Sequence, residues 1–527
     1  MKKSDENLQN AYNALVLEQE MWIKKEAFLL KQKGELQAEI DRLNDQLKKL
    51  LQERYGQKSE KIKNGENPNP DEPSFFDEAA LTEEEEREIK TAEEEFVDVP
   101  EHRRKKPGRR RLPDTLPREQ ILHDLEPHEK ICSCGCELSR IGEETSEQLE
   151  FTPAVIKVLE HVRPKYACKA CEEGVKIAPV PTQIMPKSIA TPGLLAHVFC
   201  CKFEDHLPLY RQEKIWQRLG VDLPRATLCN WVLKCGHLFV PLVNLAKEEL
   251  INRNYVHADE TTVQVLKEPG KSATSKSYMW VYLTGGPEKP ILIYEYAPGR
   301  GGVFPSQFLE KFKGYLQTDA YGGYNVLRAR DNIIVLGCMA HVRRKFIEIV
   351  KRTNKTGKAQ IAVNYIAKLY AIEKYAREEK LHVDEIFKLR QEKSKPILDK
   401  FKDFLSELAP KVPPKSALGL AIAYALSNWV AINIYLENGI LNIDNNPVEN
   451  KIRPFALGRR NWLFMGNPRG ATAAAAIFSL IESAKANGLE GYYYLRHILT
   501  KLPYCQSKEE LRALLPHYCD PAEINKL

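Results

Sequence analysis

The sequence predicts an α/β domain in which three carboxylates meet at one edge of a sheet. Two strand candidates carry an aspartate among apolar and β-branched residues: residues 254–263 contain Asp259, and residues 314–324 contain Asp319. A third acid, Glu449, comes later, in the run Asp-Asn-Asn-Pro-Val-Glu-Asn-Lys-Ile-Arg-Pro. A single aspartate at a strand end is more often a turn residue, so the prediction depends on the order of all three.

The elements between the two aspartates supply that order. Residues 277–283 and 291–296 are strand candidates, and residues 304–312 are a short helix candidate. The chain therefore has three strands, a helix, a fourth strand beside the first, and a fifth strand at 333–338. This is the core order of a ribonuclease-H-like domain, in which aspartates end neighbouring strands and a glutamate arrives on a helix.

The three acids are candidate catalytic residues and candidate metal ligands. Carboxylate oxygens are the ligands that Mg²⁺ prefers, and Mn²⁺ can replace it. We expect Asp259, Asp319 and Glu449 to hold two such ions, which suits in-line attack on a phosphodiester by water or by a 3′-hydroxyl. Lys451 and Arg453, about one turn along the same helix, are expected to bind the flanking phosphates.

The sequences around the acids resemble the large transposase of the IS66-type insertion sequences. The motifs that carry the resemblance are His-Ala-Asp-Glu-Thr, Thr-Asp-Ala-Tyr-Gly-Gly-Tyr and Asn-Asn-Pro-Val-Glu-Asn-Lys-Ile-Arg-Pro. The resemblance implies a DDE-type DNA transposase, a polynucleotidyl transferase that binds element terminal repeats and target DNA and catalyses strand cleavage and strand transfer. Small accessory proteins of the same element are further candidate partners.

Two other functions are considered. One is a non-catalytic, zinc-containing DNA-binding regulator or architectural protein, and the presence of all three acids counts against it. The other is a stand-alone ribonuclease-H-like nuclease, and the additional segments described below count against it, because they suit the recognition and pairing of DNA ends.

Composition limits the class of protein. The 527 residues allow about three or four domains, and the net charge of +6 is small enough that any nucleic-acid surface must be local. No apolar run approaches the length of a membrane span, and the N-terminal residues do not begin a signal peptide. Several of the 12 cysteines are clustered, which favours metal ligands and buried thiols over disulfides. We expect a protein of the bacterial cytoplasm that acts on DNA and has no membrane partner.

A seven-residue repeat dominates residues 1–55, which we predict to form a leucine-zipper-like coiled coil and a homo-oligomer. The alternative is one amphipathic helix packed on its own body. The repeat positions are Leu8, Leu15, Trp22, Leu29, Leu36, Leu43 and Leu50.

Residues 56–118 are predicted to be an acidic linker followed by a basic hook. The hook suits the minor groove of A·T-rich DNA, and a non-specific basic tether is an equal alternative. The candidate DNA-binding residues are Arg103, Arg104, Lys105, Lys106, Arg109, Arg110 and Arg111.

Two groups of cysteines in residues 119–185 predict a small zinc-binding domain. Cys168 and Cys171 have the C-x-x-C spacing of a tetrahedral Zn²⁺ site. The earlier group has three alternating cysteines, so Cys134 pairs with Cys132 or with Cys136. Four thiolates leave no open position, so one structural Zn²⁺ is expected, and a set of free thiols is the alternative.

Residues 186–250 are predicted to form a helical, helix-turn-helix-like DNA-binding segment. Arg225 and Thr227 lie near the start of its second helix, where base edges are reached. The alternative is a plain helical hairpin that packs on the catalytic core.

Residues 251–480 complete the catalytic domain, with a helical insertion at about 355–438, and residues 481–527 form a C-terminal helical segment. After the fifth strand comes Cys338-Met-Ala-His341, which also resembles the family. A packed cysteine and a hydrogen-bonded histidine are favoured here over a metal site. Arg343 and Arg344 are expected to face DNA phosphates.

Overall fold

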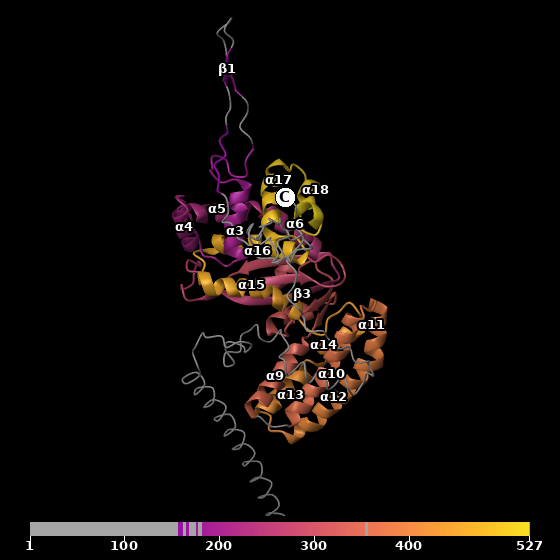
Figure 1. Ribbon diagram of the computed structural model, residues 1–527. Coiled ribbons are helices and arrows are strands. Elements are labelled where there is room, and N and C mark those ends of the chain that lie inside the picture. Colours follow the sequence, from indigo (N-terminus) through magenta and orange to yellow (C-terminus); the bar gives the residue numbers. More distant parts are fainter. Residues whose placement is uncertain (1–155, 162–164, 168–174, 178–181, 354–356, 526–527) are drawn as a thin grey trace, which may run out of the picture. The chain divides into compact units, whose positions relative to one another are not determined.

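The computed structural model describes residues 156–161, 165–167, 175–177, 182–353 and 357–525 (Figure 1). Residues 98–181 belong to one compact unit and residues 182–527 to another. In the smaller unit, β1 (Lys165–Ala167) pairs antiparallel with β2 (Val175–Ile177). The predicted coiled coil, the basic hook and the candidate zinc ligands lie outside the described residues.

A five-stranded sheet lies at the centre of the larger unit, with the strand order β5-β4-β3-β6-β7. The first three strands in sequence form an antiparallel meander, whereas β6 pairs parallel with β3, and β7 pairs parallel with β6. This mixed sheet confirms the predicted α/β class. The strands are β3 (Tyr255–Gln264), β4 (Lys276–Thr284), β5 (Leu292–Ala297), β6 (Gly314–Gln317) and β7 (Ile333–Leu336).

The fourth strand is shorter than predicted. It ends at Gln317, before Asp319, because the chain turns at Ala320, whose φ of 66° lies in the left-handed region that β-strands do not use. The connections around this strand are α7 (Val303–Phe308), the 3₁₀ turn η1 (Gly322–Tyr324) and α8 (Asn325–Arg328).

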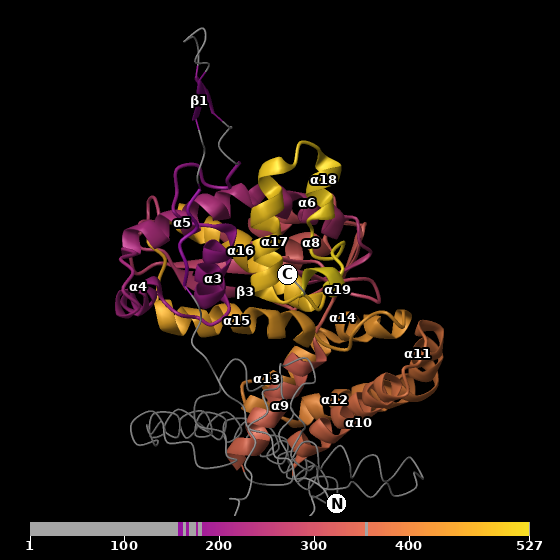
Figure 2. The same cartoon turned by 45° about the horizontal axis from the view of Figure 1, so that its top comes forward.

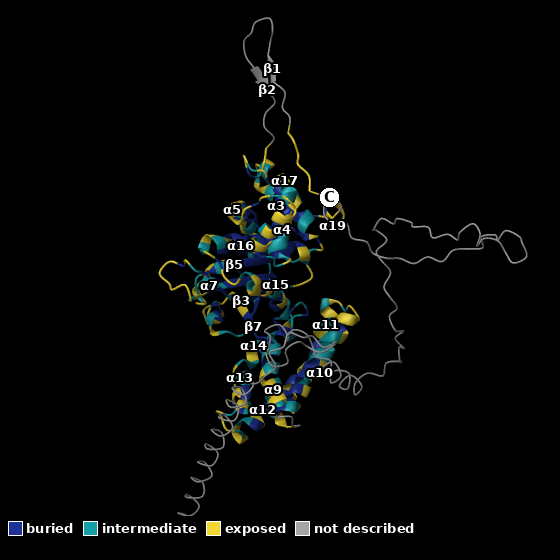
Figure 3. Ribbon diagram, turned by 60° about the vertical axis from the view of Figure 1, so that its left-hand side comes forward, coloured by how far each residue is buried: buried dark blue, intermediate teal, exposed yellow. Residues whose placement is uncertain are grey.

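Helices α15 and α16 pack against the sheet (Figure 2). Helix α15 (Asn446–Trp462) contacts β3 and β4, and α16 (Pro468–Ala486) contacts the edge strand β5. The hydroxyls of Ser479 and Ser483 hydrogen-bond the backbone of β5 at Tyr294 and Leu292, at 2.8–3.3 Å. Because these hydroxyls satisfy backbone groups of an edge strand, α16 closes that side of the sheet. Figure 3 shows buried residues concentrated in the sheet and in α16.

The four helices before the sheet share this core. They are α3 (Pro192–Phe203), α4 (Leu209–Arg218), α5 (Arg225–Leu238) and α6 (Val240–Ile251). In α5, Leu228 and Trp231 are buried in the same cluster as the sheet and α16. A Cβ added to Gly236 would lie 2.5 Å from the Cβ of Ala473, so glycine allows α5 and α16 to approach closely. The helix pair predicted at 186–250 is therefore present, and it packs on the body of the domain.

The residues of the predicted insertion are helical and form a second hydrophobic core, to which Tyr255 and Leu336 of the sheet also contribute. Buried Arg390 links its parts, because it pairs with Glu373 at 2.7–2.8 Å and donates to three backbone carbonyls. Helix α9 (Met339–Thr353) precedes the predicted insertion and packs on it. The elements of the insertion are α10 (Lys358–Glu378), α11 (Val383–Leu389), the π turn η2 (Arg390–Ser394), α12 (Lys395–Leu408), η3 (Ala409–Lys411), α13 (Ala417–Ser427), α14 (Trp429–Asn433) and η4 (Ile434–Glu437).

After α16 the described residues continue as short helices. They are α17 (Gly491–Lys501), η5 (Leu502–Tyr504), α18 (Lys508–Ala513) and α19 (Pro521–Ile524). Within the described ranges, no single helix has both the length and the hydropathy of a membrane span, although two bent helix pairs pass that test by length and composition.

Candidate active site

The parallel pairing of β3 with β6 aligns the two aspartates. Its register pairs Tyr255 with Tyr315 and His257 with Gln317. Continued by two residues, this register places Asp259 level with Asp319, just where β6 has ended. Asp259 lies inside the longer strand β3, which continues to Gln264 against β4, whereas the sequence predicted it at a strand end. It lies two residues beyond the last parallel pair, His257 with Gln317.

The turn after β6 holds the Asp319 carboxylate. The backbone N–H of Tyr321 donates to Asp319 Oδ1 at 2.8 Å, which is possible because Ala320 adopts its left-handed conformation between them. Such a conformation costs a non-glycine residue roughly 1 kcal/mol or more and is found most often at functional sites. From the insertion, the hydroxyl of Tyr424 donates to the Asp319 carbonyl at 3.2 Å.

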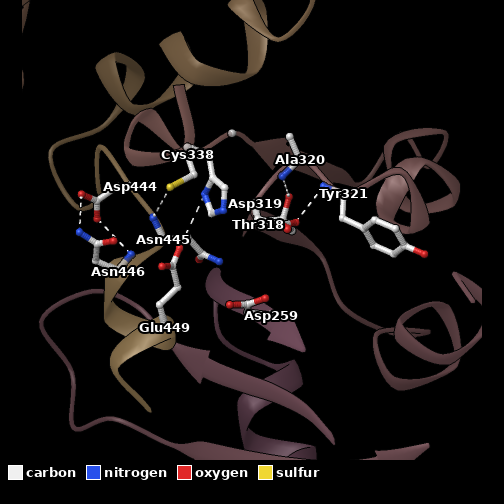
Figure 4. Close-up of polar contacts among 12 residues, drawn as sticks. Asp259, Thr318, Asp319, Ala320, Tyr321, Cys338, Asp444, Asn445, Asn446 and Glu449 are labelled. Carbon is white, nitrogen blue, oxygen red and sulfur yellow. Dashed lines mark hydrogen bonds and ion pairs between the residues drawn. The ribbon is translucent and has the colours of Figure 1, made fainter. Parts of the chain in front are cut away.

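Asn445 fixes the start of α15 and thereby places Glu449. Its side-chain N–H donates to the Ala258 carbonyl at 3.0 Å, and its Oδ1 lies 3.1 Å from Nδ1 of His257. Its backbone N–H donates to the Cys338 sulfur at 3.2 Å. Glu449, in the first turn of α15, is 4% exposed. Figure 4 shows the three acidic side chains directed toward one region from three separate elements.

The acids repel one another in a buried setting. The pKa of Asp259 is raised well above its ordinary value, first by burial and then by the charges of Glu260, Asp319 and Glu449. Burial also raises the pKa of Asp319, although the Tyr321 N–H and the charges of Arg300 and Arg344 act in the opposite direction. A divalent cation between the carboxylates would offset both the burial and the repulsion, so this donor set fits Mg²⁺.

Two polar residues near the acids were not identified from the sequence. Glu260 is buried, with Oε1 accepting from Nε of Arg300 at 2.6 Å and Oε2 accepting from the Tyr324 hydroxyl at 2.9 Å. Glu260 stands next to Asp259 in its motif, which was the available signal. Arg300 lies in a loop, and nothing in its sequence position marks it, because only tertiary contacts bring it to Glu260.

Cys338 and His341 lie beside the glutamate. The sulfur, a ring nitrogen of His341 and a Glu449 oxygen all lie within 4.8 Å of one another. Nδ1 of His341 is 3.7 Å from Glu449 Oε1, and burial lowers the pKa of His341 to about 3, so the ring is neutral at pH 7. The cysteine is packed as expected. The set of sulfur, nitrogen and oxygen donors also suits a borderline cation such as Zn²⁺.

The basic candidates divide into two groups. Arg343 and Arg344 on α9, and Lys451 and Arg453 on α15, are half-buried on the helices that begin beside the acids. The charge of Arg344 lowers the pKa of Asp319, which places it near the site.

The second group lies on another element. Arg225 is exposed at the start of α5, with its backbone N–H donating to Glu213 at 2.7 Å, and Thr227 is half-buried on the same helix.

Comparison with protein families gives matches along most of the chain. The transposase IS66 family model matches residues 187–473, and the zinc-finger binding domain of transposase IS66 matches residues 129–172. Residues 42–121 match a model described as transposase C of IS166 homeodomain, and residues 479–517 match the IS66 C-terminal element.

Three uncharacterized proteins of Sinorhizobium fredii are similar over most of their length. Protein y4jD is 35% identical over 77% of this chain and 81% of its own. Protein y4qI is 33% identical over 77% of each chain, and y4hP is 31% identical over 76% of this chain and 75% of its own. From the family model that spans the sheet, the insertion and the acids, together with these relatives, it follows that the chain belongs to the IS66 family of transposases.

Proposed function

We propose that this transposase is a DDE-type enzyme that cuts the ends of an IS66-type insertion sequence and joins them to target DNA. The observation that carries the proposal is the convergence of three carboxylates, the buried Asp259 and Glu449 and the half-buried Asp319. The charges of Asp319 and Glu449 raise the pKa of Asp259. Buried acids that repel one another are costly unless cations are bound, and two-metal sites use such acids for phosphodiester chemistry.

The strand order supports a ribonuclease-H-like fold for this domain. The antiparallel meander β3–β4–β5, followed by β6 and β7 parallel to β3, has the order expected for that fold. The helix with the third acid, α15, follows the insertion and packs on β3, which is where the fold requires its glutamate.

The residues of the chain have separable roles in the reaction. Asp259, Asp319 and Glu449 would hold two Mg²⁺ ions, which when bound supply an activated nucleophile and stabilise the leaving oxygen. The Tyr321 N–H fixes the orientation of Asp319, and Asn445 fixes α15.

Basic side chains near the acids would neutralise the DNA phosphates. Arg343, Arg344, Lys451 and Arg453 are proposed to bind the phosphates of the strand, because they lie on the two helices that begin at the acids.

The remaining segments would recognise and pair the DNA ends. We propose that the basic hook and the start of α5, with Arg225 and Thr227, contact DNA, and that residues 1–55 join two or more copies. The family's zinc-finger model supports one bound zinc ion at residues 129–172. Its ligands are proposed to be Cys134, Cys168 and Cys171 with Cys132 or Cys136.

Strand cleavage of a labelled duplex that carries one end of the element tests the function. The parent is expected to nick it with Mg²⁺, whereas Asp259→Ala, Asp319→Ala and Glu449→Ala should bind the duplex as the parent does and fail to nick it. Asp331→Ala, which removes an exposed acid in the turn before β7, is the matched control and should cleave. A parent that binds but never cleaves would favour the non-catalytic regulator.

A further inference from the structure

The connection between β5 and α7 brings an arginine to the acids. Residues 298–302 read Pro-Gly-Arg-Gly-Gly and lie against the turn that follows Asp319. A Cβ added to Gly302 would lie 2.3 Å from the Gly323 carbonyl oxygen, so only glycine permits this approach. The indole N–H of Trp280 also donates to the Gly299 carbonyl at 3.4 Å. The backbone on both sides of Arg300 is therefore held.

Side-chain contacts also hold the guanidinium of Arg300. Its Nε donates to Glu260 at 2.6 Å, and its carbon lies 3.7 Å from the centre of the Tyr321 ring. The Tyr321 hydroxyl donates back to the Arg300 carbonyl at 3.4 Å. Since Tyr321 also donates its backbone N–H to Asp319, the same residue positions the aspartate and the guanidinium.

Arg300 keeps donors for a ligand. Its side chain is 41% exposed, whereas that of Glu260 is fully buried. Within the described residues, its hydrogen bond to Glu260 uses Nε, and no bond engages either Nη. Arg390, by contrast, is a structural arginine. Its side chain is 3% exposed, and its Nε, Nη1 and Nη2 all donate hydrogen bonds to Glu373 or to backbone carbonyls.

We propose that Arg300 binds a phosphate oxygen of the DNA strand next to the acids, and that Glu260 is its positioning residue. The charge of Arg300 acts on Asp319, so a phosphate on its Nη donors would lie close to that aspartate. Two Nη donors fit phosphate oxygens in the fork geometry that arginine offers and lysine does not. The inference rests on the proposed function, and it adds a phosphate contact outside the three motifs.

The experiment measures binding and cleavage separately, on duplexes that carry one element end and a neutral methylphosphonate at one position near the cut. Binding is measured with Ca²⁺ and cleavage with Mg²⁺. One methylphosphonate position should weaken binding by the parent roughly tenfold, as expected for one lost charge-assisted contact. Arg300→Ala should weaken binding of the unmodified duplex by the same factor. The methylphosphonate at that position should then cause no further loss of binding by this variant.

Cleavage by Arg300→Ala at saturating DNA should fall roughly 100-fold, the loss typical of one preorganised donor. The double variant Glu260→Gln/Arg300→Ala separates the two possible causes. It removes both charges, so it restores the parent rate if Arg300 serves only to neutralise Glu260, and it stays slow if Arg300 binds phosphate. Arg328→Ala removes an exposed arginine from the nearby α8 and should match the parent.

Recovery by the double variant, or unchanged methylphosphonate sensitivity in Arg300→Ala, would overturn the inference. Absence of cleavage by the parent would instead overturn the proposed function, and the binding comparison would still report on Arg300.

Discussion

The side chain of Asn445 donates to the carbonyl of Ala258 at 3.0 Å, although the two residues are 187 positions apart in the sequence. Ala258 immediately precedes Asp259, and Asn445 immediately precedes α15. This bond therefore joins the strand of the first acid to the helix of the third. The whole insertion lies between them in sequence, so its folding must bring this contact together.

Asn445→Ala is expected to separate the third acid from the first two. The change removes the bonds to Ala258 and His257 and leaves buried groups without partners, at about 1–3 kcal/mol each. The melting temperature should fall and cleavage should be lost, whereas DNA binding should persist. Thermal unfolding and the nicking assay measure this. Asn461→Ala, at an exposed position of the same helix, should behave like the parent. Full cleavage by Asn445→Ala would show that Glu449 is placed by other contacts.

The burial of His257 predicts that the fold loses stability in acid. It is fully buried between Asn442 and Asn445, and burial lowers its pKa from 6.5 to about 4. Because the folded chain takes up this proton less readily than the unfolded chain, the contribution of His257 is complete above pH 6.5 and is lost as pH falls toward 4.

The expected loss across that window is roughly 3 kcal/mol. His257→Gln keeps a hydrogen-bonding side chain but does not titrate, so its melting temperature should fall less between pH 7 and pH 4.5. Equal pH dependence in the two chains would contradict the assignment.

The sequence predicted the elements whose signals are local. Three predictions needed only neighbouring residues: the strand of apolar and β-branched residues around Asp259, the strands at 277–283 and 291–296, and the order of the acids. The order of these elements predicted a fourth strand beside the first, and in the structure β6 does lie beside β3.

Other features depend on residues that meet only after folding. No local sequence pattern predicts three of these contacts: the hydrogen bonds of Asn445, the close approach of Gly302 to Gly323, and the ion pair between Glu260 and Arg300. The strand around Asp259 was predicted, but its pairing was not: β3 continues against β4 beyond the point where its pairing with β6 stops.

The zinc ligands can be distinguished by single substitutions. The full chain should contain one zinc ion, and Cys168→Ser or Cys171→Ser should lose it, because a tetrahedral site does not tolerate loss of a thiolate. Comparison of Cys132→Ser with Cys136→Ser identifies the fourth ligand, since only one of them should release zinc. Metal analysis after gel filtration measures the content, with Cys229→Ser, an exposed free thiol on α5, as control. A folded parent without zinc would rule out the site.

The heptad repeat predicts an oligomer that depends on residues 1–55. The polar residues Gln19, Glu26 and Lys33 occupy positions in the seam, so the assembly should be weak and should dissociate on dilution. Light scattering over a range of concentrations should give a dimer or larger species for the full chain and a monomer for residues 56–527. A full-length monomer at all concentrations would argue for a helix packed on its own body.

Asp444 provides the sharpest test of Glu449, because it is the other acid at the start of α15. It is buried, and both of its oxygens accept hydrogen bonds, from the Tyr370 hydroxyl at 2.7 Å and from Asn446 at 3.0–3.1 Å. Figure 4 shows it beside Asn446. These bonds stabilise the turn into α15, so we expect Asp444 to act as a structural residue.

We therefore expect opposite results from two isosteric variants. Asp444→Asn should lower the free energy of unfolding by about 1–3 kcal/mol, because one bonded carboxylate oxygen becomes an amide N–H, and the folded protein should still cleave DNA. Glu449→Gln should stay folded, bind DNA and fail to cleave, because a neutral amide is a poor ligand for Mg²⁺. Thermal unfolding and nicking assays on both variants decide between the acids. If Glu449→Gln cleaves DNA and a folded Asp444→Asn does not, then Asp444 is the third metal ligand in place of Glu449.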